Sequence, residues 1–376
     1  MTATIVWVGP VRGTSGYAEE GRSLTRALSE SGFSVTILAI DEPSQFSDIP
    51  TAVSLHHHSI ADWVAQSPPN SETVYIYSRY WAAAPVNTPG RHIWRTMFEC
   101  QSVPPSWLAV STMYDEIWVP SAFNVETFLR GGVERSRLRC LPCPVPEWNE
   151  MLLQTLMSRE ASHDSSVFNF LSVMKWEERK GWDVLMRAFT EEFGDSHKVR
   201  LTIKTSPSAF SDTRRPSDDI NQYLRSVGRE SLGNVRVIAQ HISNEQLLRL
   251  YAQADAFVLP SRGEGWGRGY MEAMLCGLPA IGTAWSGNLS FMTPDNSILL
   301  GYDLVDCSPA AVRRWPYFTG QRWAEPSKAD LREAMRNVVS GFRAPTATRR
   351  TAMAMTRNYS LPAIGRRMQQ LLAAPA

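Results

Sequence analysis

The sequence predicts an α/β protein with two domains. Its 376 residues exceed the length that one hydrophobic core usually serves. A strand, a glycine turn, a helix and a second strand follow one another over residues 5–40, and a new series of this kind begins near residue 167. Short apolar runs such as residues 256–259 are typical of parallel strands that are buried on both faces. We therefore expect a parallel sheet in each half of the chain.

The first half of the chain opens with a βαβ pattern. Gly13 and Gly16 form a turn after the first strand, and a helical pattern extends from there to Gly32. Ser121 is the expected N-cap of a later helix. The glycine spacing does not give the G-x-G-x-x-G fingerprint of dinucleotide-binding folds. The candidate strands of this half are residues 5–9, 34–40, 74–77, 92–98 and 117–120.

The domain junction is expected between residues 142 and 166. A proline-rich stretch at 142–148 and a polar stretch at 158–166 flank a short helical piece there. We place the domains at residues 1–155 and 165–350, followed by a segment at 351–376. The candidate strands of the second domain are residues 167–173, 199–203, 235–238, 256–259 and 280–283.

The stretch after residue 259 has the features of a ligand-binding loop. Pro260 stops the strand, and four glycines follow within seven residues before a helix begins near residue 270. A loop and a helix start at the carboxyl end of a parallel strand expose free amide groups that bind phosphates. Two carboxylates flank the loop. Glu264 can accept hydrogen bonds from sugar hydroxyls, and Glu272 lies one helical turn in, where it can bind a ribose diol.

The E-x7-E element from Glu264 to Glu272, followed by Ala-Met-Leu-Cys-Gly-Leu-Pro, resembles the donor-site signature of retaining glycosyltransferases of family 4. The resemblance covers most of the chain. It implies the GT-B fold, in which two Rossmann-like β/α/β domains face each other across a cleft and a C-terminal helix, here residues 359–372, crosses back to the first domain. It also implies a nucleotide-sugar donor, retention of anomeric configuration and no metal or other cofactor.

Residues 175–182, Lys-Trp-Glu-Glu-Arg-Lys-Gly-Trp, resemble the basic diphosphate-binding segment of the same family. Cations suit this place because the leaving nucleoside diphosphate gains negative charge as the glycosidic bond breaks. Lys180 matches the family's lysine best. The family's companion arginine is not matched, and the cations that could replace it are Lys175, Arg179 and Lys204. A solvated basic turn is the alternative.

Further donor-site and acceptor-site residues follow from the resemblance. The glycine turn of the first domain would face the donor, which makes Gly16 and Tyr17 candidates; a plain tight turn is the alternative. Many relatives have a histidine after the strand that corresponds to residues 93–98, where this chain has Glu99. Glu99 either takes a polar role on the acceptor side or caps the next segment. The loop itself contributes Gly265, Trp266, Gly267 and Arg268 to donor binding.

The composition excludes other classes of function. Lys and Arg number 38 against 37 Asp and Glu, so the chain has no electrostatic footprint for general nucleic-acid binding. We expect a cytoplasmic protein, since residues 1–10 lack a targeting signal, no apolar run could span a bilayer, and five cysteines indicate free thiols. The Cys140–Cys143 pair lies among prolines and the histidines at 56–58 point in different directions, so neither predicts a metal site.

The C-terminal segment is basic. From residue 334 to the end there are arginines and no acidic residues. This pattern indicates a solvated or interdomain face, or a contact with anionic acceptors or a membrane surface.

We therefore predict a metal-independent enzyme that moves a sugar from a nucleotide sugar, most readily a UDP- or GDP-sugar, to the hydroxyl of a carbohydrate, lipid-linked or other acceptor. Lys180 and the loop amides would stabilise the departing diphosphate, Glu264 would orient the sugar and Glu272 the ribose. The alternatives are a GT-B nucleotide-sugar epimerase or hydrolase, and a catalytically silent nucleotide-sugar-binding subunit.

Overall fold

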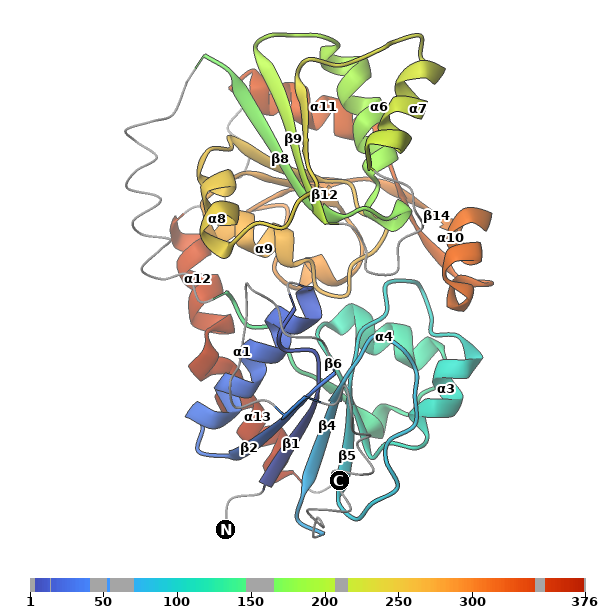
Figure 1. Cartoon of the computed structure of the whole chain (residues 1–376), viewed down its shortest axis with the longest axis vertical. Coiled ribbons are helices and arrows are strands. Elements are labelled where there is room, and N and C mark those ends of the chain that lie inside the picture. Colours follow the sequence, from blue (N-terminus) through green and yellow to red (C-terminus); the bar gives the residue numbers. More distant parts are fainter. Residues whose placement is uncertain are drawn as a thin grey trace. The chain divides into compact units, whose positions relative to one another are not determined.

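A computed structural model describes residues 4–13, 15–40, 53–54, 71–146, 166–206, 216–341 and 349–374. The chain forms two compact units (Figure 1). The first consists of Met1–Glu147, Val312–Arg322 and Met355–Ala376, and the second of Trp148–Ala311 and Trp323–Ala354. Most of the predicted junction, and the histidines at 56–58, lie outside the described residues.

The first unit is built on a parallel sheet with the strand order β3-β2-β1-β4-β5-β6-β7. Every neighbouring pair is parallel, and the direction in which the strands are added changes between β1 and β4. A change of this kind is a topological switch point, beside which α/β sheets bind ligands. The strands are β1 (Thr4–Gly9), β2 (Ser34–Ala39), β3 (Val53–Ser54), β4 (Val74–Ser78), β5 (Arg91–Arg95), β6 (Glu116–Val119) and β7 (Leu138–Cys140).

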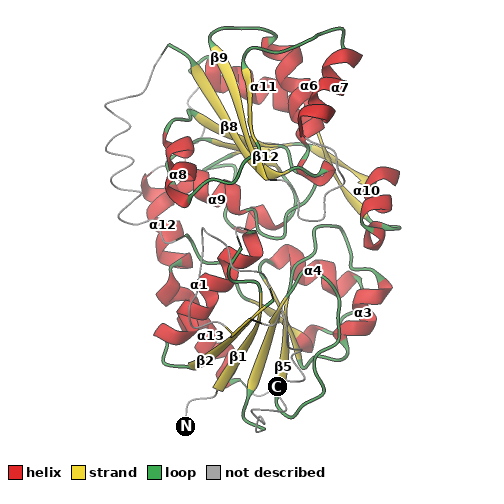
Figure 2. Ribbon diagram, in the orientation of Figure 1, coloured by secondary structure: helices red, strands yellow, loops and turns green. Residues whose placement is uncertain are grey.

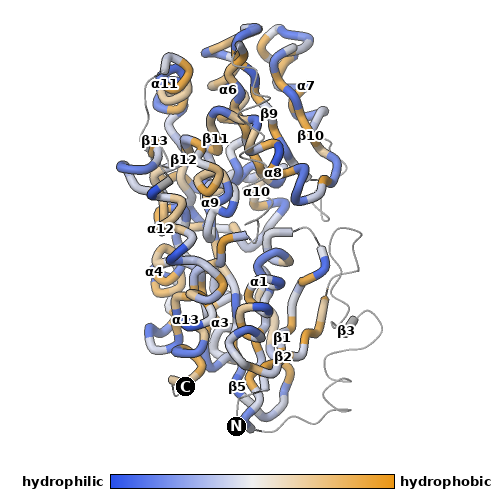
Figure 3. Tube along the Cα trace, turned by 90° about the vertical axis from the view of Figure 1, so that its left-hand side faces the viewer, coloured by the Kyte–Doolittle hydropathy of each residue, from blue (hydrophilic) through white to orange (hydrophobic). Residues whose placement is uncertain are grey.

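Helix α1 (Gly16–Glu30) and the last helix, α13 (Leu361–Ala373), lie side by side in the first unit (Figure 1). Both helices are amphipathic, and Figure 3 shows α1 with hydrophilic and hydrophobic turns. Leu24 and Leu28 from α1 share one core with Ile364 and Met368 from α13. The C-terminal helix therefore returns to the first domain, as predicted. The unit also contains α3 (Pro105–Ser111) and α4 (Ala122–Arg130), which Ser121 caps as expected.

A segment from the second half of the chain also packs in the first unit. It includes the end of α10 (Pro309–Arg314) and the 3-10 helix η4 (Pro316–Phe318). The ring of Tyr317 lies 5.9 Å from that of Phe98, and the amide of Gln101 donates to the carbonyl of Arg322 at 2.9 Å. Residues 312–322 thus form an excursion between two strands of the second unit, β14 (Tyr302–Asp306) and β15 (Arg322–Pro326).

The second unit has a six-stranded parallel sheet with the order β10-β9-β8-β11-β12-β13. Its switch point lies between β8 and β11. Helices cover both faces, with α6 and α11 next to each other (Figure 2). The strands are β8 (Phe168–Lys175), β9 (Val199–Ser206), β10 (Val235–Ile238), β11 (Ala256–Leu259), β12 (Ala280–Thr283) and β13 (Ile298–Leu300), and the helices are α6 (Trp182–Phe193), α7 (Pro216–Ser226), α8 (Asn244–Ala252), α9 (Arg268–Leu275) and α11 (Lys328–Val339).

Two predicted elements have boundaries that differ from the expected ones: a strand that ends earlier and a helix that begins later. The strand at 92–98 stops at Arg95, because the backbone of Phe98 leaves the sheet and donates from its amide to Asn124 Oδ1 at 2.8 Å. The helix at 359–372 begins at Leu361, because Ser360 caps it by accepting a hydrogen bond from the amide of Ala363. A separate helix, α12 (Arg349–Tyr359), precedes it.

A fully buried ion pair joins α1 to the carboxyl end of β5. Arg95 is 0% exposed and Glu20 1%. The Nε atom of Arg95 lies 3.1 Å from Glu20 Oε1, and its Nη1 atom donates to the carbonyl of Leu141 at 2.7 Å. Cys143 Sγ donates to the same carboxylate oxygen at 3.0 Å. The pair therefore connects three separate segments, and neither charge can be left without the other.

We predict that Arg95→Met lowers the stability of the first unit by about 3–5 kcal/mol, because it leaves the Glu20 carboxylate buried without its partner. The thermal midpoint measured by calorimetry should fall, and the double variant Glu20→Gln/Arg95→Met should recover part of the loss. The control is Arg26→Ala, which breaks an exposed pair with Glu30 and should change stability by less than about 1 kcal/mol. Equal losses of stability in Arg95→Met and Arg26→Ala would contradict this account.

Candidate functional site

The candidate site lies at the switch point of the second sheet, where two turns pack against each other. The 3-10 helix η2 (Glu178–Lys180) follows β8, and the loop from Pro260 follows β11. Gly181 ends the first turn with a φ of +69°, and a Cβ atom there would lie 1.9 Å from the carbonyl oxygen of Pro260. Glycine is required on both counts. This contact places the basic segment directly beside the glycine-rich loop.

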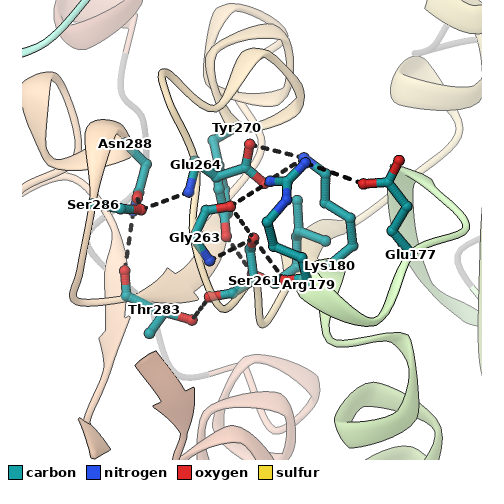
Figure 4. A network of polar contacts seen from close by, with 11 residues as sticks. Glu177, Arg179, Lys180, Ser261, Gly263, Glu264, Tyr270, Thr283, Ser286 and Asn288 are labelled. Atoms are coloured by element: carbon teal, nitrogen blue, oxygen red, sulfur yellow. Dashed lines mark hydrogen bonds and ion pairs between the residues drawn. The ribbon is translucent and has the colours of Figure 1, made fainter. Parts of the chain in front are cut away.

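Lys180 and Glu264 form the centre of the site (Figure 4). The Nζ atom of Lys180 lies 2.6 Å from Oε1 and 2.8 Å from Oε2 of Glu264. Their side chains are 14% and 8% exposed. Burial lowers the pKa of Lys180, and the Glu264 carboxylate opposes that change. The sequence analysis named both residues, and the structure brings them together as a mutual pair.

A network of small polar residues holds Glu264 in place (Figure 4). Its amide donates to Ser286 Oγ at 2.9 Å, and its carbonyl accepts from the amide of Gly287 at 2.9 Å. Ser286 has a φ of +83°, which is uncommon for a residue other than glycine, and its hydroxyl donates to Asn288 Oδ1 at 3.0 Å. Sequence reasoning gave residues 286–288 no role. Their position directly after a predicted strand was the available signal.

Arg179 stabilises the glycine-rich loop that follows β11. Its Nη1 atom donates to the carbonyl of Gly263 at 2.6 Å, and its Nη2 atom lies 3.2 Å from Glu177 Oε2. The other two candidate cations differ. Lys204 is buried at the end of β9, where burial lowers its pKa and its Nζ atom donates to the carbonyl of Thr205. Lys175 is exposed. Which of the three replaces the family's arginine stays a prediction.

Arg262 is a structural residue that the sequence analysis missed. It is 4% exposed and lies between two carboxylates. Its Nη1 and Nη2 atoms bind Asp183 at 2.8 and 2.9 Å, and its Nε and Nη2 atoms bind Glu325 at 2.6 and 3.0 Å. The guanidinium also lies over the ring of Trp323, 5.7 Å from its centroid. Arg262 therefore ties the loop after β11 to α6 and β15.

Glu272 lies in α9, which begins after Gly267 with its φ of +94°. It is 7% exposed. The hydroxyl of Tyr251 donates to its Oε2 atom at 2.9 Å, and Arg268 Nη2 lies 3.5 Å from its Oε1 atom. Burial, followed by the charge of Glu272, raises the pKa of Tyr251 well above its usual value, so this phenol stays a donor. A second hydroxyl could still bind, because a carboxylate offers about four acceptor sites.

The remaining loop candidates, Gly265 and Trp266, are both buried. Trp266 is 2% exposed, and its ring packs 5.2 Å from that of Phe291. Gly265 lies against another backbone segment, since a Cβ atom on Gly287 would come within 2.0 Å of its carbonyl oxygen. Trp266 is therefore part of the core beneath the loop, and the loop conformation depends on the backbone contact.

The candidates of the first unit gather at the carboxyl ends of β1 and β5. Gly16 is the first residue of α1 and is exposed, and Ser15 caps the helix by accepting from the amide of Ala18 at 3.1 Å. Burial, followed by the charge of Glu99, raises the pKa of Tyr17 well above its usual value. The donor role of Gly16 and Tyr17 stays a prediction.

Comparison with known proteins agrees with this geometry. Residues 165–307 match the family described as Glycosyl transferases group 1. A GDP-mannose-dependent monoacylated alpha-(1-6)-phosphatidylinositol monomannoside mannosyltransferase from Corynebacterium glutamicum is 27% identical over 135 residues, which is 34% of this chain. The match spans about a third of that relative, 32% of its length.

Solved structures resemble the whole chain. Sucrose-phosphate synthase from Thermosynechococcus elongatus superposes with a TM-score of 0.70 at 17% identity, covering 98% of both chains. HepE from Anabaena, in complex with UDP and glucose, gives 0.68 at 12% identity over 99% of this chain and 100% of that one. The chain therefore has the GT-B fold. Residues 165–307 are similar to group 1 glycosyltransferases, and the predicted resemblance to family 4 is confirmed.

We predict that Glu264→Gln lowers the pKa of Lys180 further, because the variant removes the carboxylate that opposes burial. An NMR titration of ¹³Cε-labelled lysine should show the Lys180 resonance titrating at lower pH than in the wild type. Lys204 is the internal control, since burial alone lowers its pKa, and its titration should not move. An unchanged Lys180 titration would show that the pair does not form in solution.

Proposed function

We propose that this protein is a glycosyltransferase that moves a sugar from a nucleotide-sugar donor to an acceptor hydroxyl, with retention of configuration and without a metal. The observation that carries the proposal is the buried Lys180–Glu264 pair at a sheet switch point, inside the segment that matches the family. The mannosyltransferase relative is named as GDP-mannose-dependent, and HepE was solved with UDP and glucose, which supports a GDP- or UDP-sugar here. We assign the donor to residues 165–350 and the acceptor side to residues 1–155.

The leaving group would be stabilised by three kinds of positive potential. Lys180 supplies a full charge, the loop from Gly265 to Gly267 supplies backbone amides, and α9 presents its amino end after Gly267. Arg179 and Arg262 hold the loop in place, since they bind the carbonyl of Gly263 and the carboxylate of Asp183. Lys180 binds Glu264, the side chain that we assign to the sugar, so Lys180 is the cation that we assign to the diphosphate.

Donor binding would exchange the partners of the central pair. Lys180 and Glu264 neutralise each other at 2.6 Å. The diphosphate would take the ammonium group, and the sugar hydroxyls would donate to the carboxylate that it leaves. Because both charges start paired, each would change one partner for another and neither would be buried alone. Glu272, already oriented by Tyr251, would bind the ribose with its remaining acceptor sites.

Retention needs no covalent protein nucleophile. The bond from the anomeric carbon to the phosphate oxygen breaks, and the bond to the acceptor oxygen forms on the same face. The acceptor proton passes to the departing phosphate oxygen, so the diphosphate is both leaving group and base. The protein orients both reactants and stabilises the developing charge.

Two other functions use the same site. A nucleotide-sugar epimerase or hydrolase would act without an acceptor, and a silent binding subunit would hold the donor without reaction. Incubation of the pure protein with UDP- and GDP-sugars, with release of free nucleotide measured with and without acceptors, separates the three. Release that depends on an acceptor supports transfer. Release without one supports hydrolysis or epimerisation, and binding without release supports the silent subunit.

We also propose that the protein is cytoplasmic, on the basis of its cysteines. None of the five cysteines, Cys140 and Cys143 included, forms a disulfide, which fits a reducing cytoplasm. No helix among the described residues combines the length and apolar character that a membrane crossing requires. The exposed arginines Arg357, Arg366 and Arg367 in α12 and α13 would contact an anionic acceptor or membrane surface, because acidic residues are absent after position 333.

We predict that the two carboxylates have separable roles. Glu264→Gln should lower turnover by two or more orders of magnitude, about 3 kcal/mol, because its amide cannot replace the charge that orients the sugar. Calorimetry should find nucleoside diphosphate affinity within about tenfold of the wild type. Glu272→Ala should mainly weaken nucleoside diphosphate binding. Unaltered nucleoside diphosphate affinity in Glu272→Ala would remove the ribose assignment. Tyr251→Phe keeps the carboxylate and removes only the hydroxyl that orients it, so it should weaken binding less than Glu272→Ala.

We predict that activity survives excess chelator. Lys180 and the loop amides carry the leaving-group charge in the proposed mechanism, so a divalent ion has no role in it. Among the described residues, no group of three histidine, cysteine or acidic side chains has metal-binding geometry. Nucleotide release should be measured before and after dialysis against chelator. Loss of activity that magnesium or manganese restores would refute the mechanism.

We predict that the basic face of α13 favours anionic vesicles. Sedimentation with vesicles containing phosphatidylserine should retain the wild-type protein more than neutral vesicles do, and salt should reduce the difference. The double variant Arg366→Glu/Arg367→Glu should lose that preference, whereas Arg225→Glu, an exposed arginine of α7, should keep it. Equal retention on both kinds of vesicle would leave a solvated face as the explanation.

A further inference from the structure

The first unit carries an aromatic patch at the carboxyl ends of its central strands. It consists of Tyr17, Tyr80 and Trp81. The rings of Tyr17 and Tyr80 lie 5.6 Å apart, and those of Tyr80 and Trp81 lie 4.8 Å apart in an edge-on arrangement. Tyr80 and Trp81 directly follow β4, which borders the switch point between β1 and β4. The patch therefore lies at the sheet edge where this class of fold binds ligands.

Trp81 is unusual among the described tryptophans because it is 38% exposed. An exposed indole exposes apolar area to water that a folded protein usually buries. The ring of Tyr80 lies 4.8 Å from the indole at an interplanar angle of 81°, and Trp81 remains 38% exposed. At the ligand-binding edge of a sheet, an exposed indole offers an apolar contact surface to a bound molecule.

The backbone on both sides of Tyr80 and Trp81 is fixed. The amide of Arg79 donates to the carbonyl of Arg95 at 3.2 Å, and its own carbonyl accepts from Trp94 Nε1 at 3.3 Å. On the far side, the hydroxyl of Tyr114 donates to the carbonyl of Ala83 at 2.7 Å. The Arg79 side chain binds that hydroxyl at 2.8 Å and so joins the two ends. The backbone that carries Trp81 is therefore held on both sides, which lowers the entropic cost of ordering this segment on binding.

A carboxylate, Glu99, follows the end of β5 by four residues, and it belongs to the same edge of the sheet as Tyr80 and Trp81 because β4 and β5 are parallel neighbours. Burial, followed by the charge of Glu99, raises the pKa of Tyr17. The patch thus combines apolar ring faces with an acceptor of hydrogen bonds. A pyranose ring has the complementary surface, because its axial C–H groups form an apolar face and its hydroxyls donate at the rim. A phosphate group would be repelled by the same carboxylate.

We propose that Tyr80 and Trp81 form a stacking subsite for a neutral pyranose ring of the acceptor, with Glu99 accepting a hydrogen bond from one of its hydroxyls. This inference rests on the proposed function and specifies its acceptor class as a carbohydrate. Glu99, which the sequence analysis left between an acceptor role and a cap, is a binding residue in this arrangement. Trp81 determines affinity for the ring through its exposed face.

The test measures binding of methyl α-pyranosides of glucose, mannose, galactose and N-acetylglucosamine by saturation-transfer-difference NMR, with UDP or GDP present. At least one pyranoside should receive saturation at its ring protons. Trp81→Ala should weaken that binding at least tenfold and Trp81→Phe less, because phenylalanine keeps an aromatic face. Glu99→Gln should weaken binding without abolishing it. The control Met353→Ala changes another exposed apolar side chain and should leave binding unchanged.

The outcomes separate this inference from the proposed function. Nucleoside diphosphate binding, measured by calorimetry on the same samples, tests the donor site in the second unit and should be equal in the wild type and Trp81→Ala. If the nucleotide binds and none of the pyranosides does, or if a pyranoside binds equally to Trp81→Ala, the carbohydrate subsite is refuted and the donor site stands. If a pyranoside binds through Trp81 and no nucleotide binds, the subsite stands and the proposed function fails.

Discussion

The contact between Gly181 and Pro260 determines the geometry of the second unit's site. The two turns that follow β8 and β11 can approach this closely because residue 181 has no side chain and has a positive φ. The approach brings Lys180, one residue before the glycine, to Glu264, four residues after the proline. A β-carbon at position 181 would push the two turns apart, and the ammonium and carboxylate groups would each be buried without a partner.

Around this contact, one set of interactions holds the loop in place, and a second interaction, the Lys180–Glu264 pair, can exchange its partners. Arg262 binds two carboxylates at once, Arg179 binds a carbonyl and a carboxylate, and Ser286 and Asn288 fix the backbone of Glu264. These interactions are short and largely buried, so they cost much to break. The Lys180–Glu264 pair is equally short, but the ammonium group of Lys180 can also bind an anion, and the carboxylate of Glu264 can also bind a hydroxyl. The site is thus organised in advance and still able to exchange its central interaction.

The sequence predicted the parts of this architecture that depend on local patterns. The strand at 256–259 coincides with β11, the glycine-rich loop was identified from its spacing, and Lys180 was identified from the resemblance to the family. The site residues that were missed act over long sequence separations. Arg262 binds Glu325, 63 positions away, and Ser286 binds the amide of Glu264, 22 positions away. Polar residues of these types are common on surfaces, so their types alone do not reveal a buried partner.

The same limit applies to the first unit. Its strands follow from apolar runs, but β5 ends at Arg95 because Asn124, 26 positions away from Phe98, binds the backbone of that phenylalanine. The burial of Arg95 against Glu20 is also invisible in a linear pattern, because helix periodicity places a glutamate on a core-facing position of α1 without indicating its partner. Tertiary partners determined these details, and local propensity did not.

The excursion of residues 312–322 into the first unit bears on how such chains can be recombined. Each unit is assembled from separated stretches, and Phe318 packs beside Phe98 although β14 and β15, which flank it, belong to the second unit. A chimera that took its donor half from one relative and its acceptor half from another would import a foreign aromatic segment into the host's core. Compatible exchange therefore requires three grafts that match as a set: the donor half, the 312–322 excursion and the terminal helix.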